Sequence, residues 1–159
     1  MEEKIEKDSK QKTESVMMTV LCLTILAYYI MGKDVRSLMG KIKNADWKRL
    51  AGGLKDKLRP YARKAGRVAA RPLLQFYFVM QDEKTTALDR VLIYAAIFYT
   101  VSPSSLIPAS VFKLLGVLDE GAAVVYVYKK VKGKITPDIN RKVEAVLDRW
   151  FEAKCVPAE

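Results

Sequence analysis

The distribution of hydrophobic and polar residues along this chain predicts a protein made of helices. Two long runs carry no charged residue, one over residues 15–32 (SVMMTVLCLTILAYYIMG) and one over residues 91–112. Elsewhere, apolar residues recur at steps of three and four positions, which matches the 3.6-residue turn of an α-helix. We therefore predict an all-α fold.

Residues 15–32 are apolar on every side of the predicted helix, whereas a helix at a protein surface keeps a polar face. The run would span about 27 Å, close to the ~30 Å hydrocarbon core of a bilayer. Tyr28 and Tyr29 fall near its end, where membrane helices carry an aromatic belt. We predict a transmembrane anchor at 15–32 behind a polar tail at 1–14. A cleaved signal peptide and a buried helix of a soluble domain are the alternatives.

The basic residues are concentrated in one segment. The whole excess of the net charge of +10 lies in residues 33–71, where thirteen lysines and arginines stand against three aspartates. Because these cations crowd the C-terminal flank of residues 15–32, the positive-inside rule predicts a single-pass protein of the inner membrane with a cytoplasmic main body. Such a basic block is expected to meet an anionic partner, either lipid head groups or nucleic acid.

The basic segment, 33–71, is itself amphipathic. After Asn44, a candidate N-cap, one helical face collects the apolar residues Trp47, Leu50, Ala51, Leu54 and Leu58. Prolines 60 and 72 suit the start and the end of a second helix. A spacing of four residues along this second stretch predicts one arginine stripe, made of Arg59, Arg63, Arg67 and Arg71.

We expect this stripe to contact anionic lipid, because the polybasic stretch begins next to the predicted anchor. The predicted contact residues are Arg59, Arg63, Arg67, Arg71, Lys48 and Arg49. Trp47 is the predicted interfacial anchor. A solvated basic face is one alternative, and binding to nucleic-acid phosphates is another. The sequence has no RNA-binding sheet pattern, zinc site or clear helix-turn-helix that would favour nucleic acid.

Residues 72–153 predict a small helical-hairpin domain, followed by a tail at 154–159. Thr86 and Asp89 form a capping-box pattern, with Asp in place of Glu, before a helix at 87–101 that has two apolar faces. A return helix is predicted at 118–133. Thr136 then caps a last helix, which begins at Pro137 and has the expected buried face Ile139, Val143, Val146, Leu147, Trp150 and Phe151.

Three motifs lie C-terminal to the helix at 87–101, namely SPSSLIPASVFKLLGVLDE, ITPDI and DRWF. Over residues 70–152 the chain resembles the YkvA-like family (domain of unknown function 1232), with matches at Pro103, Leu106, Ile107, Pro108, Gly116, Asp119 and Glu120. The resemblance implies a small helical domain, often in membrane-associated proteins, with no agreed biochemical activity. Two aspartates of the family turn are Ser105 and Ala109 here, so a site built on them would be partly lost.

The residue types argue against most kinds of catalytic site. The chain has no histidine, which removes the usual general base and the commonest metal ligand. Cys22 and Cys155 lie far apart, without a C-x-x-C motif. Asp119 and Glu120 alone are too few for a hard cation, so a metal-assisted enzyme built on them is only the third hypothesis. We predict no catalytic residue, metal or cofactor.

Together these patterns predict a non-enzymatic membrane protein, a scaffold or regulator that binds anionic lipid and a protein partner or a second copy of itself. The alternative is a nucleic-acid-binding protein that is tethered at the membrane. The first hypothesis predicts binding to anionic vesicles. The second predicts steeply salt-dependent binding to duplex DNA or RNA, because each phosphate contact releases counterions.

Overall fold

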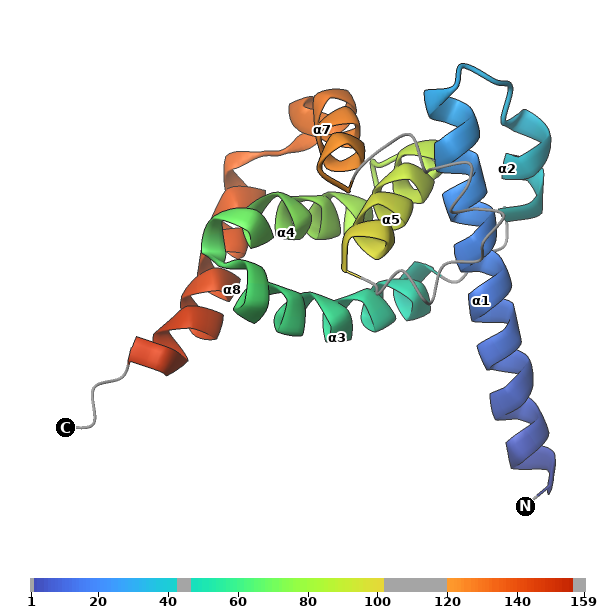
Figure 1. The fold of residues 1–159 in the computed structure, drawn as a ribbon, viewed down its shortest axis with the longest axis horizontal. Coiled ribbons are helices and arrows are strands. Elements are labelled where there is room, and N and C mark those ends of the chain that lie inside the picture. The colour runs from blue at the N-terminus through green and yellow to red at the C-terminus, as the bar shows by residue number, and fades with distance from the viewer. Residues whose placement is uncertain (1, 43–46, 102–119, 156–159) are drawn as a thin grey trace.

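The structure is a computed structural model that describes residues 2–42, 47–101 and 120–155. These residues form helices and no strand, which confirms the predicted all-α fold (Figure 1). The elements are α1 (Glu2–Ile30), α2 (Arg36–Ile42), α3 (Trp47–Ala65), α4 (Arg67–Gln81), α5 (Ala87–Val101), α7 (Glu120–Val131), the short 3₁₀ helix η2 (Lys132–Lys134) and α8 (Pro137–Cys155).

Helix α5 is the centre of the fold and contacts α1, α3, α4 and α7. In Figure 1 it lies between α1 on one side and α4 on the other. Helix α5 is apolar on two faces, and each face packs against neighbouring helices. As a result, every residue from Val91 to Ile97 is buried. The predicted bounds of 87–101 are confirmed, and both of the expected apolar faces are packed against neighbouring helices.

Helix α1 packs on α5 through the middle of the first apolar run. The hydroxyl oxygens of Thr19 on α1 and Tyr94 on α5 lie 2.9 Å apart across this contact. Five residues of the run are at most 1% exposed, namely Cys22, Leu23, Ile25, Leu26 and Ala27. The apolar run is therefore part of the hydrophobic core that α5 organises.

The same run ends in a turn that depends on glycine. Gly32 has a φ of 78°, which glycine adopts readily. The amides of Gly32 and Lys33 donate to the carbonyl oxygens of Tyr29 (3.0 Å) and Tyr28 (2.9 Å), and these bonds close the helix. In the part of the chain that the structure describes, no helix is long and apolar enough to cross a membrane. The predicted anchor at 15–32 thus has no support from the fold.

The basic segment folds largely as α3 and α4, which pack against each other. The predicted apolar face of α3 is confirmed, since Leu50, Ala51, Leu54 and Leu58 are buried and Trp47 is half-buried. On the far side of α3, away from this face, the helix is covered by charged residues.

The predicted break points in the basic segment are wrong. Pro60 and Pro72 lie inside α3 and α4, and the chain breaks instead at Gly66, which has a φ of 99°. Pro60 is exposed, so water can solvate the carbonyl group that its missing amide leaves unpaired. Gly66 takes a positive φ with little strain, because it has no Cβ. The arginines on either side of Gly66 therefore belong to different helices.

Two predicted helix starts are confirmed by hydrogen bonds to threonine. The Thr136 hydroxyl accepts the amide of Ile139 at 3.1 Å, and α8 begins at Pro137. The Thr86 hydroxyl accepts the amide of Asp89 at 3.3 Å, but the Asp89 carboxylate pairs with lysines of α7 and η2 instead of completing a capping box. On the expected face of α8, Ile139, Val143, Val146 and Leu147 are buried, and Trp150 and Phe151 are half-buried.

One hydrophobic core joins the segments that the sequence suggests as an anchor, a basic segment and a hairpin domain. It contains residues of α1, α2, α3, α4, α5, α7 and α8. The predicted return helix at 118–133 corresponds to α7, whose first residue is Glu120. The family-motif residues from Pro103 to Asp119 lie outside the described residues.

Candidate anion-binding face

Helix α3 has one buried face and one charged face. The exposed charged residues are Lys48, Arg49, Lys55, Asp56, Arg59, Arg63 and Lys64, and we call them the basic face of α3. This division follows from the sequence, because the buried residues recur at three and four positions and the cations occupy the positions between them. The basic face is therefore a property of one helix and needs no distant segment to complete it.

Three cations of the basic face, Lys55, Arg59 and Arg63, follow one another at intervals of four residues, or about 6 Å along the helix. In the described part of the chain, none of them forms an ion pair. Together with Trp150 of α8 they line a groove of about 590 Å³. Asp56 is the one carboxylate in its described lining, so three cations and one anion leave a net charge of +2.

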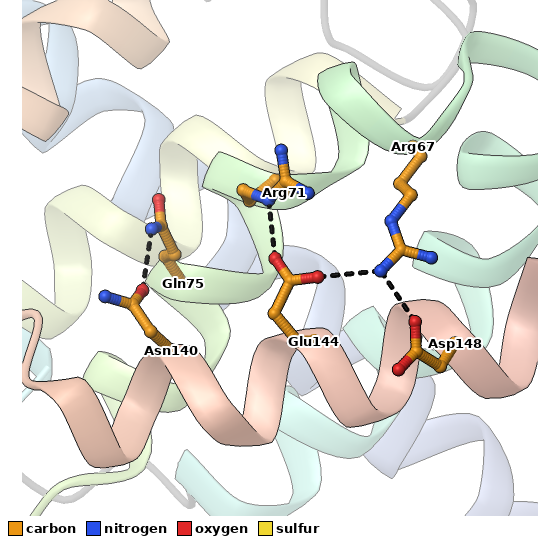
Figure 2. A network of polar contacts seen from close by, with 6 residues as sticks. All are labelled: Arg67, Arg71, Gln75, Asn140, Glu144 and Asp148. Carbon is orange, nitrogen blue, oxygen red and sulfur yellow. Dashed lines mark hydrogen bonds and ion pairs between the residues drawn. The ribbon is translucent and has the colours of Figure 1, made fainter.

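The other two arginines of the predicted stripe, Arg67 and Arg71, lie on α4 and point toward α8 (Figure 2). Nη2 of Arg67 lies 2.7 Å from Oε2 of Glu144 and 2.7 Å from Oδ1 of Asp148. Nε of Arg71 lies 2.8 Å from Oε1 of Glu144. Two guanidinium groups thus face two carboxylates, and their charges cancel locally.

The electrostatics of this network agree with its geometry. Hydrogen bonds from Arg71 and Arg67 hold the pKa of Glu144 below its ordinary value of 4.5. Hydrogen bonds to Asp148 and Glu144 raise the pKa of Arg67 above its ordinary value. The predicted single stripe is therefore divided at Gly66. Its half on α3 is unpaired among the described residues, and its half on α4 is paired with α8.

The first three residues of α3 differ in their exposure to solvent. Lys48 and Arg49 are exposed, as a contact with an anion requires. Trp47 is half-buried, and its ring lies edge-on to Tyr94 with 6.2 Å between ring centroids. This contact fixes the indole against the core, and insertion of Trp47 into lipid stays a prediction.

Two members of the groove, Lys55 and Trp150, were not among the residues that the sequence suggested for anion contact. Lys55 was detectable, because it extends the four-residue spacing of Arg59 and Arg63 by one turn. Trp150 was not detectable in this role, since it was expected on the buried face of α8 and only the packing of α8 beside α3 brings it to the groove.

A second charged cluster also escaped the sequence analysis. Asp89, buried near the start of α5, has Lys130 of α7 3.7 Å from one carboxylate oxygen, and Lys134 of η2 donates to the other. Nζ of Lys130 also lies 5.1 Å from the ring centroid of Tyr29 on α1. The cluster joins three elements around a buried carboxylate, which is the arrangement of a structural contact.

Among the residues that the structure describes, no three acidic or cysteine side chains are placed to hold a metal ion together. Asp119 lies outside the described residues, and of Glu120 only the position in α7 is described. The metal hypothesis on this pair is therefore not tested by the fold. No family model matches the chain, and no curated protein or solved structure shows significant similarity to it. The resemblance to the YkvA-like family stays a prediction.

Proposed function

We propose that the protein is a non-enzymatic, membrane-associated scaffold or regulator that binds an anionic lipid surface through the basic face of α3. One observation carries the proposal: Lys55, Arg59 and Arg63 form a row of cations, unpaired among the described residues, beside a groove of net positive charge. Like charges one turn apart destabilise a helix by roughly 0.2–0.5 kcal/mol per pair. An anionic surface along the row attracts all three cations and offsets their mutual repulsion.

The mode of binding follows from the opposite face of α3. Its apolar residues are buried in the fold, so they are not free to insert into lipid as those of an interfacial helix are. Binding is then electrostatic, with about 1 kcal/mol for each lysine or arginine near an anionic leaflet. Such binding weakens with salt, because the Debye length falls from about 10 Å at 0.1 M to about 3 Å at 1 M.

In this proposal the main body lies at the cytoplasmic leaflet of the inner membrane, where anionic lipids are exposed to basic segments. The row on α3 acts without a membrane-crossing helix, and Cys22 to Ala27 of α1 can keep their contacts with α5. A scaffold of this kind holds a protein partner, or a second copy of itself, at the membrane surface.

The test is sedimentation of the full chain with vesicles of phosphatidylcholine and phosphatidylserine, against vesicles of phosphatidylcholine alone. The informative variant is Arg59→Gln/Arg63→Gln, and its matched control is Arg67→Gln/Arg71→Gln, which removes the same charge from the paired half of the segment. We expect the first variant to lose about 2 kcal/mol of binding free energy to the anionic vesicles, which is roughly a thirtyfold loss of affinity. The control should lose much less, because Glu144 and Asp148 already neutralise those arginines.

Equal losses in the two variants would favour the single stripe that the sequence suggests, in which all four arginines contact lipid. Unchanged binding in both would sink the lipid role. Washing cell membranes first with high salt and then with alkaline carbonate adds a second criterion, since a protein held only by the basic face leaves in the salt wash. Tighter binding to duplex DNA or RNA than to the vesicles would instead favour the nucleic-acid alternative.

A further inference from the structure

A second pocket lies at the other end of α3, where the start of that helix meets the end of α4 and the start of α5. Its volume is about 680 Å³, which falls in the range of about 300–1,000 Å³ that is usual for small-molecule sites. Its lining includes Trp47 and Lys48 of α3, Met80 of α4 and Arg90 of α5. None of these residues lines the groove beside Arg59 and Arg63.

Arg90 is the least satisfied polar side chain in this region. One of its terminal nitrogens, Nη2, donates to the backbone carbonyl of Asp82 at 2.9 Å, which fixes the guanidinium group in place. Its Nε is buried and has no hydrogen-bond partner among the described residues. A buried donor without a partner is unfavourable, so the guanidinium group of Arg90 has hydrogen-bonding capacity that the described residues leave unused.

The charges around the pocket favour a negatively charged ligand. Lys48 is exposed and has no ion-pair partner in the described ranges, and it stands at the pocket together with Arg90. Glu83 is the one acidic residue in the described lining, so two cations and one carboxylate leave a net charge of +1. An anion that bridges Lys48 and Arg90 would therefore be bound by charge-assisted hydrogen bonds.

The remaining walls favour an apolar body on that ligand. Trp47 lies edge-on to Tyr94 and supplies an aromatic wall, and Met80 supplies a flexible thioether that adapts to irregular shapes. The amide of Gln81 adds one neutral polar group. Apolar walls with a few convergent polar groups are the usual composition of a ligand site.

From these features we infer that the pocket between α3, α4 and α5 binds a small organic anion, in which a carboxylate or phosphate group is carried on a short aliphatic or aromatic body. The anionic group lies between Lys48 and Arg90, and the body lies against Trp47 and Met80. This site shares Lys48 with the basic face of α3, but it uses neither Arg59 nor Arg63, the two arginines that the vesicle test replaces.

The indole N–H signals of the two tryptophans provide the test. Trp47 lines this pocket and Trp150 lines the other groove, and the variant Trp150→Phe assigns the two signals in a ¹⁵N–¹H spectrum of the full chain. Octanoate and phenyl phosphate are titrated separately, with octan-1-ol and phenol as uncharged counterparts. We expect saturable shifts of the Trp47 signal with at least one anion and no saturation with its uncharged counterpart.

The variants separate pocket binding from general attraction to a basic protein. Lys48→Glu should weaken binding of the anion about tenfold or more, and Arg90→Gln should abolish it. Lys64→Glu, which makes the same change of charge on the same helix but outside this pocket, should leave affinity within about twofold. If Arg90→Gln fails to fold, as circular dichroism would show, Lys48→Glu still decides the question.

Octanoate binding without phenyl phosphate binding identifies a carboxylate on an aliphatic body, and the reverse identifies a phosphate on an aromatic one. The inference is overturned if neither anion moves the Trp47 signal, if only the Trp150 signal moves, or if Lys48→Glu and Lys64→Glu bind equally well. Vesicle binding by the same preparation is read separately, so failure of one proposal does not decide the other.

Discussion

Arg71 and Glu144, 73 residues apart in the chain, form an ion pair in which Nε of Arg71 lies 2.8 Å from Oε1 of Glu144. Arg67 uses the other oxygen of the same carboxylate, so Glu144 is shared by two arginines (Figure 2). This one carboxylate connects α4 to α8. It also removes two of the four predicted stripe arginines from the set of unpaired cations.

The first prediction concerns Glu144→Gln. Removing the shared carboxylate should lower the stability of the fold and at the same time strengthen binding to anionic vesicles, because Arg71 loses its described ion-pair partner and Arg67 keeps only Asp148. A merely disrupted protein would lose both properties. Urea denaturation gives the midpoint, and vesicle sedimentation gives the affinity. A variant with a lower midpoint and unchanged binding would contradict the separation into paired and unpaired halves.

The second prediction is the pH dependence of the same contact. The arginine partners of Glu144 lower the pKa of its carboxyl group in the folded state. The ionised carboxylate therefore stabilises the fold at pH values above its ordinary pKa of 4.5. This stability is lost as the pH falls through the lowered folded-state value. The difference in urea midpoint between the natural chain and Glu144→Gln should therefore be largest near neutral pH and shrink in acid. A difference independent of pH would contradict the ion pair.

The third prediction concerns the two adjacent glycines of α3, Gly52 and Gly53. Both are exposed, neither has a positive φ, and a Cβ built on either meets nothing within 4 Å. Each change to alanine should raise the free energy of unfolding by about 1 kcal/mol, because alanine loses less backbone freedom in a helix. Gly66→Ala is the contrasting control. It also has open space, but its φ of 99° strains any other residue, so it should destabilise the fold.

The fourth prediction concerns the buried Asp89. Asp89→Asn removes the charge that faces Lys130 and Lys134, and we expect a loss of about 1–3 kcal/mol in the free energy of unfolding. Both lysines are partly exposed and can turn to water, which limits the loss. Asp138→Asn is the control, because its partners Arg141 and Lys142 are exposed and such pairs contribute about 0–1 kcal/mol. Equal losses would contradict a structural role for the Asp89 cluster.

The fifth prediction tests the packing of α1. Burial raises the pKa of the Cys22 thiol to about 12, so very little reactive thiolate is present near neutral pH. In the variant Cys155→Ser, which leaves Cys22 as the only thiol, a disulfide reagent should react far more slowly with the native protein than with the protein in guanidinium chloride. Equally fast reaction in both states would mean that Cys22 does not face α5 as described.

Much of the helical framework could be predicted from local signals. The bounds of α5, the buried face of α3 and the Thr136 cap of α8 each depend on residues within a few positions of one another, and the structure has them as expected. Such features depend on periodicity and on side chains that bond to nearby backbone amides. The break at Gly66 was not predicted, because the two prolines of this segment are stronger local signals for the end of a helix than a single glycine.

The partners of the charged residues could not be predicted in the same way. Arg67 is separated from Asp148 by 81 residues and Asp89 from Lys134 by 45, and spacing within one helix carries no information about such pairs. The candidate site shows the same difference between signals within one helix and contacts between distant segments. Arg59 and Arg63 could be proposed from spacing alone, whereas the neutralisation of Arg67 and Arg71 required the position of α8 beside α4.

The apolar pattern of residues 15–32 predicts a helix that is largely removed from water, and residues 18–30 are indeed helical and buried or half-buried. It could not determine which apolar surroundings receive them, because hydrophobicity measures the free energy of leaving water and not the identity of the medium that is entered. A bilayer and a packed protein core satisfy the same pattern. The fold places Cys22, Leu23 and Leu26 in the core around α5, where the central helix offers an apolar face on that side.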